Sequence, residues 1–301
     1  MRILRQLSAI EPARGTRNDE TRNLQLTPAL VVYWCRRVFH EKEKMADNRE
    51  EVKEYQDRLW GLIPTERITR FKIDRPSPAL IAAYKELEEA TPTIADILDS
   101  MGINGIIAAS VLRPVVPGKT AVGPAVTLRY MLEQNAVTQG FIDKAVARMA
   151  DRDAYAVAEP GDVIVMDCDG EEVSCMGGLS TIVASAKGLA GCVVYGGVRD
   201  VATMRERQYP VWAYHVTPRS GKYRIEAAEI NGPVTILGVQ VQPGDLIVAD
   251  DTGIVVIPLE KAEEVLRRAQ EATAKEARLM ELLGSGATLA EMRQILPPSK
   301  W

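Results

Sequence analysis

The chain has 301 residues, of which 46% are hydrophobic and 26% are charged, as is typical of a globular protein with a sizeable core. Its 37 basic and 41 acidic side chains give a net charge of −4, so the overall charge provides no footprint for nucleic acid. The longest early apolar run, residues 29–34, is far shorter than the roughly 20 residues of a membrane span. We therefore expect a cytoplasmic protein with neither nucleic acid nor a membrane as partner.

Cysteine and histidine are scarce. The four cysteines lack CxxC spacing, so we expect buried thiols in a reducing compartment rather than a disulfide framework. The two histidines, His40 and His215, argue against mechanisms that need a histidine cluster. We expect His215 to be a hydrogen-bonded structural residue, although its place after a predicted strand would also let it reach the crevice described below.

The first 44 residues differ from the rest of the chain. They are rich in Arg, Asn and Thr with weak periodicity, so we expect residues 1–44 to form a poorly ordered extension. Met45 opens a stretch that reads like an ordinary N-terminus, which makes the preceding segment an upstream extension or a start-site artefact; its acidic residues disfavour a transit peptide. A helical lead-in is expected over residues 45–92 and an α/β domain over residues 93–301.

From residue 78 onward helical and strand patterns alternate. Residues 93–102 predict an amphipathic helix with Thr93 as its N-cap and Gly102 as its stop. The next elements are a strand over 121–130, a helix through 141–153, a strand over 163–167, a helix after Gly178 and a strand over 191–196. This strand–helix–strand order predicts parallel pairing with a right-handed crossover.

The second half contains more strand patterns than helix patterns. A helix over 201–208 and a strand over 211–214 come first. Short β-branched runs separated by PGD and DDTG turns then fill residues 232–258 and predict antiparallel hairpins. A long helix over 259–283 closes the domain. The mixture favours a compact α/β sandwich over a long doubly wound sheet.

A pair of glycines and an Arg-Asp pair lie at opposite ends of one predicted helix–strand unit. Gly177 and Gly178 precede the helix, and the N–H groups of Leu179 and Ser180 open it. Such a helix start has unpaired donors and a favourable dipole, so it is suited to bind an anion. The alternative is that the glycines only form a turn.

Arg199 and Asp200 directly follow the strand of this unit. Residues at the carboxyl end of such a strand tend to project into a crevice. Arginine binds carboxylates bidentately, and aspartate is an oxygen ligand for Mg²⁺ or Mn²⁺. If the unit folds back on itself, both ends meet at one edge of the sheet. The alternatives are surface ion pairs, or a helix cap for Asp200.

One carboxylate interrupts an apolar stripe on the C-terminal helix. Glu276 falls in line with Ala262, Val265, Ala269, Ala272, Leu279 and Leu283. Carboxylates are rarely buried unless they are paired or bound to metal. Glu276 therefore either reaches water at the edge of the core or points into a metal site. Such a metal site could lie across a subunit interface.

The order and spacing of these motifs resemble the RraA-like family, which includes the class II 4-hydroxy-4-methyl-2-oxoglutarate / 4-carboxy-4-hydroxy-2-oxoadipate aldolases. The resemblance covers residues 93–292 and rests on Gly178, twenty intervening residues, then Arg199-Asp200, with "TIADILDSMGINGIIA", "GPAVTLR", "PGDVIVMD", "GLAGCVVYGGVRD" and "EATAKEARL". It implies an α/β/β/α sandwich of the swivelling β/β/α type with a C-terminal helix. It also implies a homotrimer or homohexamer with sites at the subunit interfaces.

The resemblance assigns roles to the residues of the predicted crevice. Asp200 would ligate Mg²⁺ or Mn²⁺, with water in most of the other positions. Arg199 would hold the keto-acid end of a small 2-keto acid substrate, whose carboxylate the backbone at Leu179 and Ser180 would take. Glu276 resembles the carboxylate that reaches the metal's waters from a neighbouring subunit.

The implied reaction is retro-aldol cleavage of a 4-hydroxy-2-keto acid to give pyruvate, and decarboxylation of oxaloacetate shares the same enolate intermediate. The metal and Arg199 would stabilise that enolate, and no Schiff-base lysine is required. Lys187, within a predicted helix, is accordingly interpreted as a solvated residue.

Two positions depart from the family pattern. Family members often carry Asp or Glu where this chain has Gly178, counted here with the substrate-binding residues, and an acidic residue where it has Thr203. Losing both removes partners for the metal's waters or a proton relay, so the substrate is expected to differ from that of the named aldolases. Asp169, Glu171 or Glu172 could substitute from the preceding loop.

Two other functions are compatible with the sequence. Some RraA proteins bind an RNA-degrading endonuclease and inhibit it without catalysis, and these regulators can retain the Arg-Asp pair. The pair alone therefore does not separate a lyase from a ribonuclease regulator. A catalytically inactive scaffold is the third interpretation, favoured by Gly178 and Thr203. Glu276 favours the lyase if it faces a neighbour's Asp200.

Overall fold

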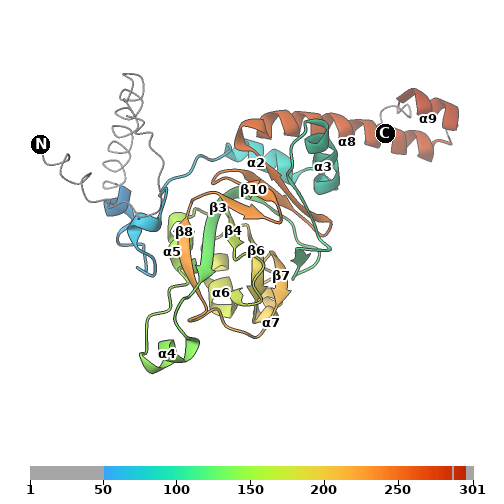
Figure 1. Cartoon of the computed structure of the whole chain (residues 1–301). Helices are drawn as coiled ribbons and strands as arrows, with labels where there is room; N and C mark the ends of the chain where they lie inside the picture. Colours follow the sequence, from blue (N-terminus) through green and yellow to red (C-terminus); the bar gives the residue numbers. More distant parts are fainter. Residues whose placement is uncertain (1–50, 287, 296–301) are drawn as a thin grey trace, which may run out of the picture. The chain divides into compact units, whose positions relative to one another are not determined.

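The computed structural model describes residues 51–286 and 288–295 (Figure 1), and they belong to one compact unit. The expectation for residues 1–44 lies outside the described residues. The expected boundary between residues 92 and 93 falls inside helix α3, Ala90–Ser100, and stays a prediction. In the described part of the chain no helix is long and apolar enough to cross a membrane.

The strands form one continuous sheet path and a separate hairpin. The path runs β1-β12-β11-β3-β4-β6-β7-β2, with β5 pairing with β6 and β8 with β3, while β9 and β10 pair only with each other. The bounds are β1 Ile106–Ala108, β2 Arg113–Pro114, β3 Ala121–Leu132, β4 Val163–Asp167, β5 Ser174–Met176, β6 Gly191–Val198, β7 Val211–Val216, β8 Ile225–Ile230, β9 Val234–Ile236, β10 Val239–Val241, β11 Leu246–Ala249 and β12 Gly253–Ile257.

Strand β3 belongs to two layers. Its first residues pair antiparallel with β11, ending at Pro124 opposite Leu246. From Ala125 opposite Val163 onward it pairs parallel with β4. The Gly-Pro pair of the sequence therefore lies where β3 changes partners. A Cβ on Gly123 would lie 2.0 Å from the Gly161 carbonyl oxygen, so only glycine allows the turn before β4 to approach this closely.

The parallel unit expected from the sequence is present. Strands β4 and β6 pair parallel, as do β6 and β7, so the helices that follow each strand cover one face of this layer. The expected hairpins are also present, since β9 pairs antiparallel with β10 and β11 with β12.

The helices are α2 Pro78–Lys85, α3 Ala90–Ser100, α4 Val137–Ile142, α5 Asp151–Val157, α6 Gly178–Ala186, α7 Val201–Glu206, α8 Ala262–Gly284 and α9 Leu289–Ile295, with 3-10 turns η2 Thr65–Arg67 and η3 Leu259–Lys261. One of the two expectations about the ends of α3 is wrong. Thr93 does not cap α3, because the helix starts at Ala90 and the Thr93 hydroxyl donates to the Glu89 carbonyl at 3.3 Å. Gly102 does follow the helix end, with φ of 68°.

The helix expected through residues 141–153 is also wrong. Helix α4 ends at Ile142 and α5 begins only at Asp151, with an irregular segment between them. Two non-glycine residues of that segment, Lys144 and Ala150, have a φ of 50°, which a right-handed helix does not allow. Ala150 is fully buried, so packing of the chain around it overrides the helical periodicity of the sequence.

Alternating side chains place three apolar cores between four layers. On β4, Ile164 and Met166 face a core shared with α5, α6 and α7, whereas Val163 and Val165 face the opposite sheet. On β12, Val255 and Ile257 face the third core, under α2, α3 and α8. Figure 1 shows the two helix groups on opposite sides of the strands. This arrangement is the α/β/β/α sandwich with a C-terminal helix that the sequence predicts.

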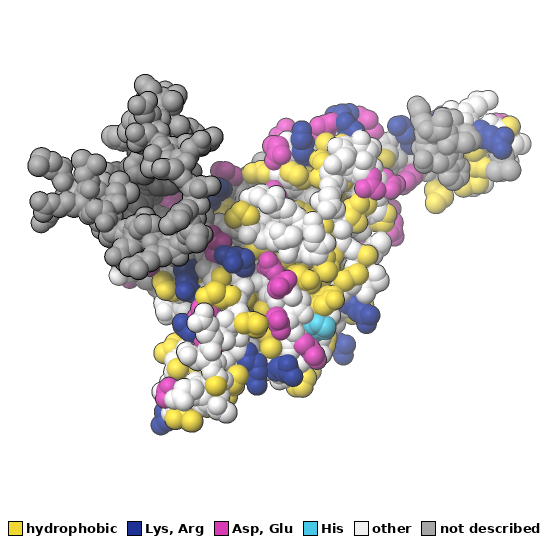
Figure 2. Space-filling model, in the orientation of Figure 1, with side chains coloured by type: hydrophobic (Ala, Val, Ile, Leu, Met, Phe, Trp, Pro, Cys, Tyr) yellow, Lys and Arg dark blue, Asp and Glu magenta, His cyan; other side chains and the backbone are white. Residues whose placement is uncertain are grey.

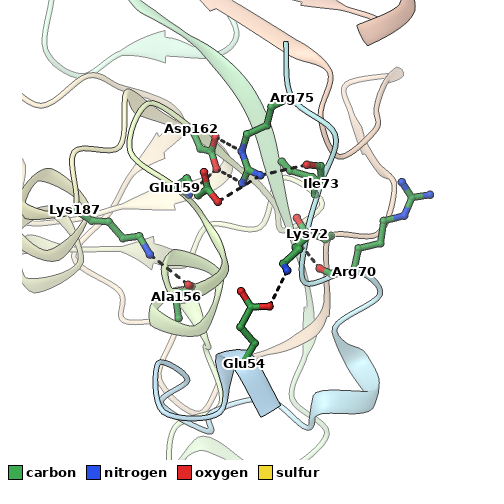
Figure 3. A network of polar contacts seen from close by, with 10 residues as sticks. Glu54, Arg70, Lys72, Ile73, Arg75, Ala156, Glu159, Asp162 and Lys187 are labelled. Atoms are coloured by element: carbon green, nitrogen blue, oxygen red, sulfur yellow. Dashed lines mark hydrogen bonds and ion pairs between the residues drawn. The ribbon is translucent and has the colours of Figure 1, made fainter. Parts of the chain in front are cut away.

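The lead-in segment is tied to the domain by an ion pair, which Figure 3 shows, and by backbone hydrogen bonds to one carboxylate. Arg75 binds Asp162 through two nitrogens, at 3.0 and 2.8 Å. Asp153, in α5, accepts backbone hydrogen bonds at 2.6 to 3.0 Å from Trp60, Gly61 and Leu62. Residues 60–62 are therefore bound to α5, and Arg75 is bound to the turn between α5 and β4.

Three of the four cysteines fall in the described part of the chain. Cys168, Cys175 and Cys192 are buried free thiols, as expected. Burial raises the pKa of the Cys192 thiol to about 12. These cysteines therefore act as small apolar core residues.

Candidate active site

The two ends of the α6–β6 unit meet at one edge of the sheet. The backbone N–H of Gly178, the first residue of α6, donates to Asp200 Oδ2 at 2.8 Å. The same oxygen lies 3.6 Å from Arg199 Nε. The side chains of Arg199 and Asp200 are about half exposed, at 45% and 49%. The carboxylate is thus held by the helix start on one side and the guanidinium on the other, while remaining open to a ligand.

Asp200 does not act as a helix cap through its side chain. It occupies the N-cap position of α7 with φ of 55° and ψ of 41°, and its carboxylate makes no capping hydrogen bond. Aspartate tolerates this left-handed conformation better than most residues. The turn directs the carboxylate across to Gly178 instead of along α7, so the cap interpretation is wrong.

The two glycines form a close cradle for the Arg-Asp pair. A Cβ on Gly177 would lie 2.8 Å from Asp200 Oδ2 and 3.1 Å from Arg199 Nε. A Cβ on Gly178 would lie 3.2 Å from Thr203 Oγ1. The glycines therefore permit a contact that any side chain would disturb, and the two departures from the family pattern, Gly178 and Thr203, lie next to each other.

A cavity of about 260 Å³ joins these groups. Its lining includes Gly178, Leu179, Ser180, Arg199 and Asp200. In α6 the first hydrogen bond back to the chain runs from the Thr181 N–H to the Gly177 carbonyl at 2.9 Å. The N–H groups of Leu179 and Ser180 come before this bond. They belong to the helix start, where N–H groups have no partner within the helix and can bind an anion. The cavity is small, which suits an acid of a few carbons.

The cavity also contains a carboxylate that the sequence analysis missed. Asp151, the first residue of α5, lines it and is only 3% exposed. Its Oδ2 accepts a hydrogen bond from the Ser180 hydroxyl, and Arg152 Nη1 lies 3.8 Å from its Oδ1. Burial raises the pKa of the Asp151 carboxyl, although the Ser180 hydrogen bond and the Arg152 charge oppose the rise. No sequence signal marked it, because Asp151 fell inside the helix predicted through residues 141–153, where nothing indicated its burial.

Several residues singled out from the sequence lie elsewhere. Asp169 and Glu171 line a different cavity, of about 590 Å³, beside Asp167 and Tyr195. Figure 2 shows acidic side chains near the coloured histidine on this face. Glu172 is exposed and does not line the Asp200 cavity. The suggestion that this loop replaces the missing acids is therefore not supported by the geometry.

His215 and Lys187 have structural contacts. His215 Nε2 lies 3.1 Å from the Gly170 carbonyl oxygen, and its ring packs edge-on against Tyr214. Lys187 is half-buried rather than solvated, and its Nζ donates to the Ala156 carbonyl at 3.3 Å (Figure 3). Burial lowers the pKa of this lysine.

Glu276 lies on the exposed part of α8. The helix buries Ala262, Val265, Leu266 and Ala269, all in its first turns, and Glu276 comes after them. It does not line the Asp200 cavity of its own chain. Its assignment to a neighbouring subunit's site stays a prediction.

The donor set at Asp200 suits one kind of metal. Across residues 51–286 and 288–295, no three His, Cys, Asp or Glu side chains converge in a metal-binding arrangement. Mg²⁺ is often held by one or two carboxylates and keeps several waters. A half-exposed aspartate beside an open cavity fits this ion, and Mn²⁺ accepts the same oxygen ligands.

The geometry and topology agree with the comparisons to known proteins. The family model RraA-like, described as Aldolase/RraA, matches residues 91–256, more than half of the chain. The chain therefore belongs to the RraA-like family.

Individual relatives differ in name and length. Protein DlpA of Legionella pneumophila is 33% identical over 207 residues, which make up 67% of this chain and only 31% of DlpA. The 4-hydroxy-4-methyl-2-oxoglutarate aldolase of Thermus thermophilus is 34% identical over 99 residues, or 33% of this chain and 60% of that enzyme. The chain thus spans less than two thirds of either relative.

A solved structure is similar over most of the domain. Streptomyces coelicolor RraAS2, described as an unusual member of the RNase ES inhibitor RraA protein family, superposes with a TM-score of 0.58 and is 28% identical. The match covers 68% of this chain and 98% of RraAS2. Relatives of this chain therefore include both a named aldolase and a member of an inhibitor family.

Proposed function

We propose that this protein is a divalent-metal-dependent lyase that cleaves a 4-hydroxy-2-keto acid to give pyruvate. The observation that carries the proposal is the Asp200 carboxylate, held by the Gly178 N–H beside Arg199 at the wall of a small cavity. The similarity to a named 4-hydroxy-4-methyl-2-oxoglutarate aldolase supports the same reaction class.

In this proposal the Asp200 carboxylate would hold Mg²⁺ or Mn²⁺. The bound ion would supply a Lewis acid that polarises the keto group. The Arg199 guanidinium faces the keto oxygen and stabilises negative charge as it develops there. The Leu179 and Ser180 N–H groups bind the substrate's carboxylate at the positive end of α6.

Decarboxylation of oxaloacetate is a second activity that the same groups would support. Loss of CO₂ leaves its electron pair on C3, which gives the same pyruvate enolate as the retro-aldol cleavage. Arg199 stabilises that charge in either case, so both substrates belong in one assay.

The test is pyruvate release from a panel of 4-hydroxy-2-keto acids and oxaloacetate, with Mg²⁺ or Mn²⁺ and with EDTA. We expect activity that needs the metal and that falls by at least ~10²-fold in Asp200→Ala and Arg199→Ala. Glu206→Ala, an exposed carboxylate on α7, is the matched control and keeps wild-type turnover. Turnover that EDTA leaves undiminished would reject the metal mechanism.

Completion of the site by a second subunit is part of the proposal. Glu276 would reach the metal's waters of a neighbouring copy in a homotrimer or homohexamer. The exposed apolar residues Met280 and Leu283, at 71% and 52% exposure on the same helix, support burial of this part of α8 against another chain.

The second candidate is a non-catalytic regulator of a ribonuclease. The similarity to RraAS2, from an RNase ES inhibitor family, favours it. The discriminating experiment adds the purified protein to an RNA-degrading endonuclease of that class and measures RNA cleavage. Inhibition without any pyruvate release from the panel would replace the lyase by the regulator.

A further inference from the structure

The cavity beside Asp200 contains a second carboxyl group on a different element. Asp151 starts α5, whereas Asp200 follows β6, and both line the same cavity. Ser180 lies between the two carboxyl groups. Its hydroxyl donates to Asp151 Oδ2, and it belongs to the first turn of α6, whose first residue, Gly178, donates to Asp200. Ser180 is itself only 8% exposed, and it lines the same cavity as Asp151 and Asp200.

The surroundings of Asp151 give its charge little support. Arg152 is the cationic group in contact with it, at 3.8 Å, and Arg199 and Asp200 line the same cavity further along. The hydroxyl groups of Tyr130 from β3 and Tyr155 from α5 are fully buried and have no hydrogen-bond partner in the described part of the chain.

The remaining neighbours of Asp151 are neutral. The thiols of Cys175 from β5 and Cys192 from β6 are affected by the Asp151 charge. A hydrogen bond with Cys168, together with burial, raises the pKa of Cys175, and burial raises the pKa of Cys192. Burial likewise raises the pKa of the two phenols. None of these groups offers Asp151 a counter-charge, so burial favours the protonated form of its carboxyl group.

The position of Asp151 also provides a proton-transfer group that the proposed reaction otherwise lacks. Gly178 and Thr203 provide no carboxylate next to Asp200, and the acidic loop with Asp169 and Glu171 lines another cavity. Retro-aldol cleavage needs a group that takes the proton of the substrate's C4 hydroxyl and returns one to C3. Among the described residues lining this cavity, Asp151 is the carboxylate other than Asp200.

We propose that Asp151 holds the transferred proton of the lyase reaction and that the Ser180 hydroxyl passes it to and from the substrate. Ser180 is then the catalytic residue that meets the substrate, and Asp151 is the positioning residue behind it. This inference rests on the proposed lyase function and adds the route of the proton.

The step balances without an outside reactant. The C4 hydroxyl gives its proton to Ser180 Oγ as the Ser180 proton moves to Asp151 Oδ2. The C3–C4 bond breaks, C4 becomes a carbonyl, and the electron pair passes to the C2–C3 enolate. The proton then returns from Asp151 through Ser180 to C3, which gives pyruvate and restores the Asp151 carboxylate.

The experiment compares kcat, KM and their pH profiles in wild type, Asp151→Asn, Ser180→Ala and Ser180→Thr, with Mg²⁺ present. We expect kcat to fall by ~10²-fold or more in Asp151→Asn and Ser180→Ala, since a lost general acid–base group costs about 10²–10⁴-fold. In these two variants KM should change little. The rise of kcat with pH that reports the ionisation of Asp151 should disappear in Asp151→Asn. Ser180→Thr, which keeps a hydroxyl group, should retain much of the wild-type activity. Asp167→Asn is the matched control, because burial also raises the pKa of Asp167 but it lines the other cavity.

A second readout separates proton transfer from bond cleavage. Wild type incubated with pyruvate in D₂O should exchange the methyl protons, followed by NMR, and Asp151→Asn should lose this exchange. Circular dichroism and thermal unfolding establish that each variant is folded.

The outcomes distinguish the two proposals. Pyruvate release and exchange that persist in folded Asp151→Asn, with an unchanged pH profile, overturn the proton route and leave the lyase standing. A wild-type protein that neither cleaves any substrate of the panel nor exchanges pyruvate protons overturns the lyase and the proton route together.

Discussion

Gly177 controls the position of the Arg-Asp pair through the absence of a side chain. A methyl group here would meet Asp200 Oδ2 at 2.8 Å and Arg199 Cγ at 3.2 Å. Both side chains can move away because they are half exposed, so the fold survives while the geometry changes. A displacement of this size is enough to reduce catalysis strongly.

We therefore predict that Gly177→Ala lowers kcat/KM by about tenfold to 10²-fold with little change in Tm. Gly284→Ala is the matched control, because Gly284 has open space around its Cβ position and lies in α8. Pyruvate release and Mn²⁺ affinity measure the effect. Full activity in Gly177→Ala would show that the close contact at Asp200 is not needed.

A second prediction for a single residue concerns the effect of Asp151 on the stability of the folded protein. Burial raises its pKa in the folded protein above the unfolded value of about 3.9. The folded state therefore binds the proton more tightly, and its favourable contribution is present at low pH and is lost as the pH rises through the folded pKa. Asparagine carries no charge at any of these pH values.

Asp151→Asn should consequently unfold at a higher temperature than wild type at neutral pH. The difference should shrink as the pH falls below the folded pKa, where Asp151 is also neutral. Thermal unfolding across a pH series measures it. A variant that is less stable than wild type at neutral pH would show that the ionised carboxylate is well supported by its surroundings.

Residue-level chemistry was only partly visible in the sequence. The sequence allowed us to predict that Gly178 lies close to Arg199 and Asp200. These residues stand at the two ends of one helix–strand unit, and its parallel pairing determines where those ends lie. Asp151 could not be found, because its burial comes from residues far along the chain, including Ser180. Lys187 was misjudged for a similar reason, since its partner is a carbonyl on α5.

At the scale of elements, α5 depends on the lead-in segment. Arg75 is 22% exposed and Asp162 only 2%, and the pair is bidentate. Asp162 also accepts a hydrogen bond from the Glu159 N–H at the end of α5. Removing the guanidinium would leave a buried carboxylate without its counter-charge.

Arg75→Ala is thus predicted to destabilise the protein by about 3 kcal/mol, the cost of breaking a buried ion pair. Lys72→Ala is the control, because the Lys72–Glu54 pair is more than half exposed and should add little. Urea unfolding provides both values. Equal effects of the two substitutions would contradict the anchoring role of Arg75.

Element boundaries show where local patterns fail. The strand at residues 163–167 and the helix after Gly178 were predicted well, because both follow clear turn signals. The segment between α4 and α5 was not, since the left-handed residues Lys144 and Ala150 have side chains that favour helix. Only the packing of Ala150 in the core reveals the break.

For the whole molecule, the exposed end of α8 bears on assembly. The apolar stripe of the sequence continues to Leu283, although the chain's own core ends at Ala269. We predict that Met280→Asp with Leu283→Asp lowers the mass measured by light scattering from a trimer or hexamer to a monomer, and that activity falls with it. A wild-type protein that is already monomeric would remove the interface part of the proposal.

Glu276 gives a separate prediction for the assembled protein. Glu276→Gln should reduce kcat by about tenfold or more while the mass is unchanged, because only the neighbour's site is affected. Glu281→Gln, exposed on the same helix, is the control. Activity equal to wild type in Glu276→Gln would place this residue outside the chemistry.

The layered architecture was predictable because the motifs over residues 93–292 resemble the RraA-like family, and the order of helix and strand patterns already favoured an α/β sandwich. The sharing of β3 between both layers was not, since the change of partner at Pro124 depends on the turn at Gly161.

That shared strand has a mechanical consequence. A force or a denaturant that opens one sheet must also pull on the backbone that forms the centre of the other. Within residues 51–286 and 288–295, the two halves of the sandwich therefore share β3, and we expect them to unfold together. Calorimetry should record their melting as a single event, and the cavity beside Asp200 should be lost with it rather than before it.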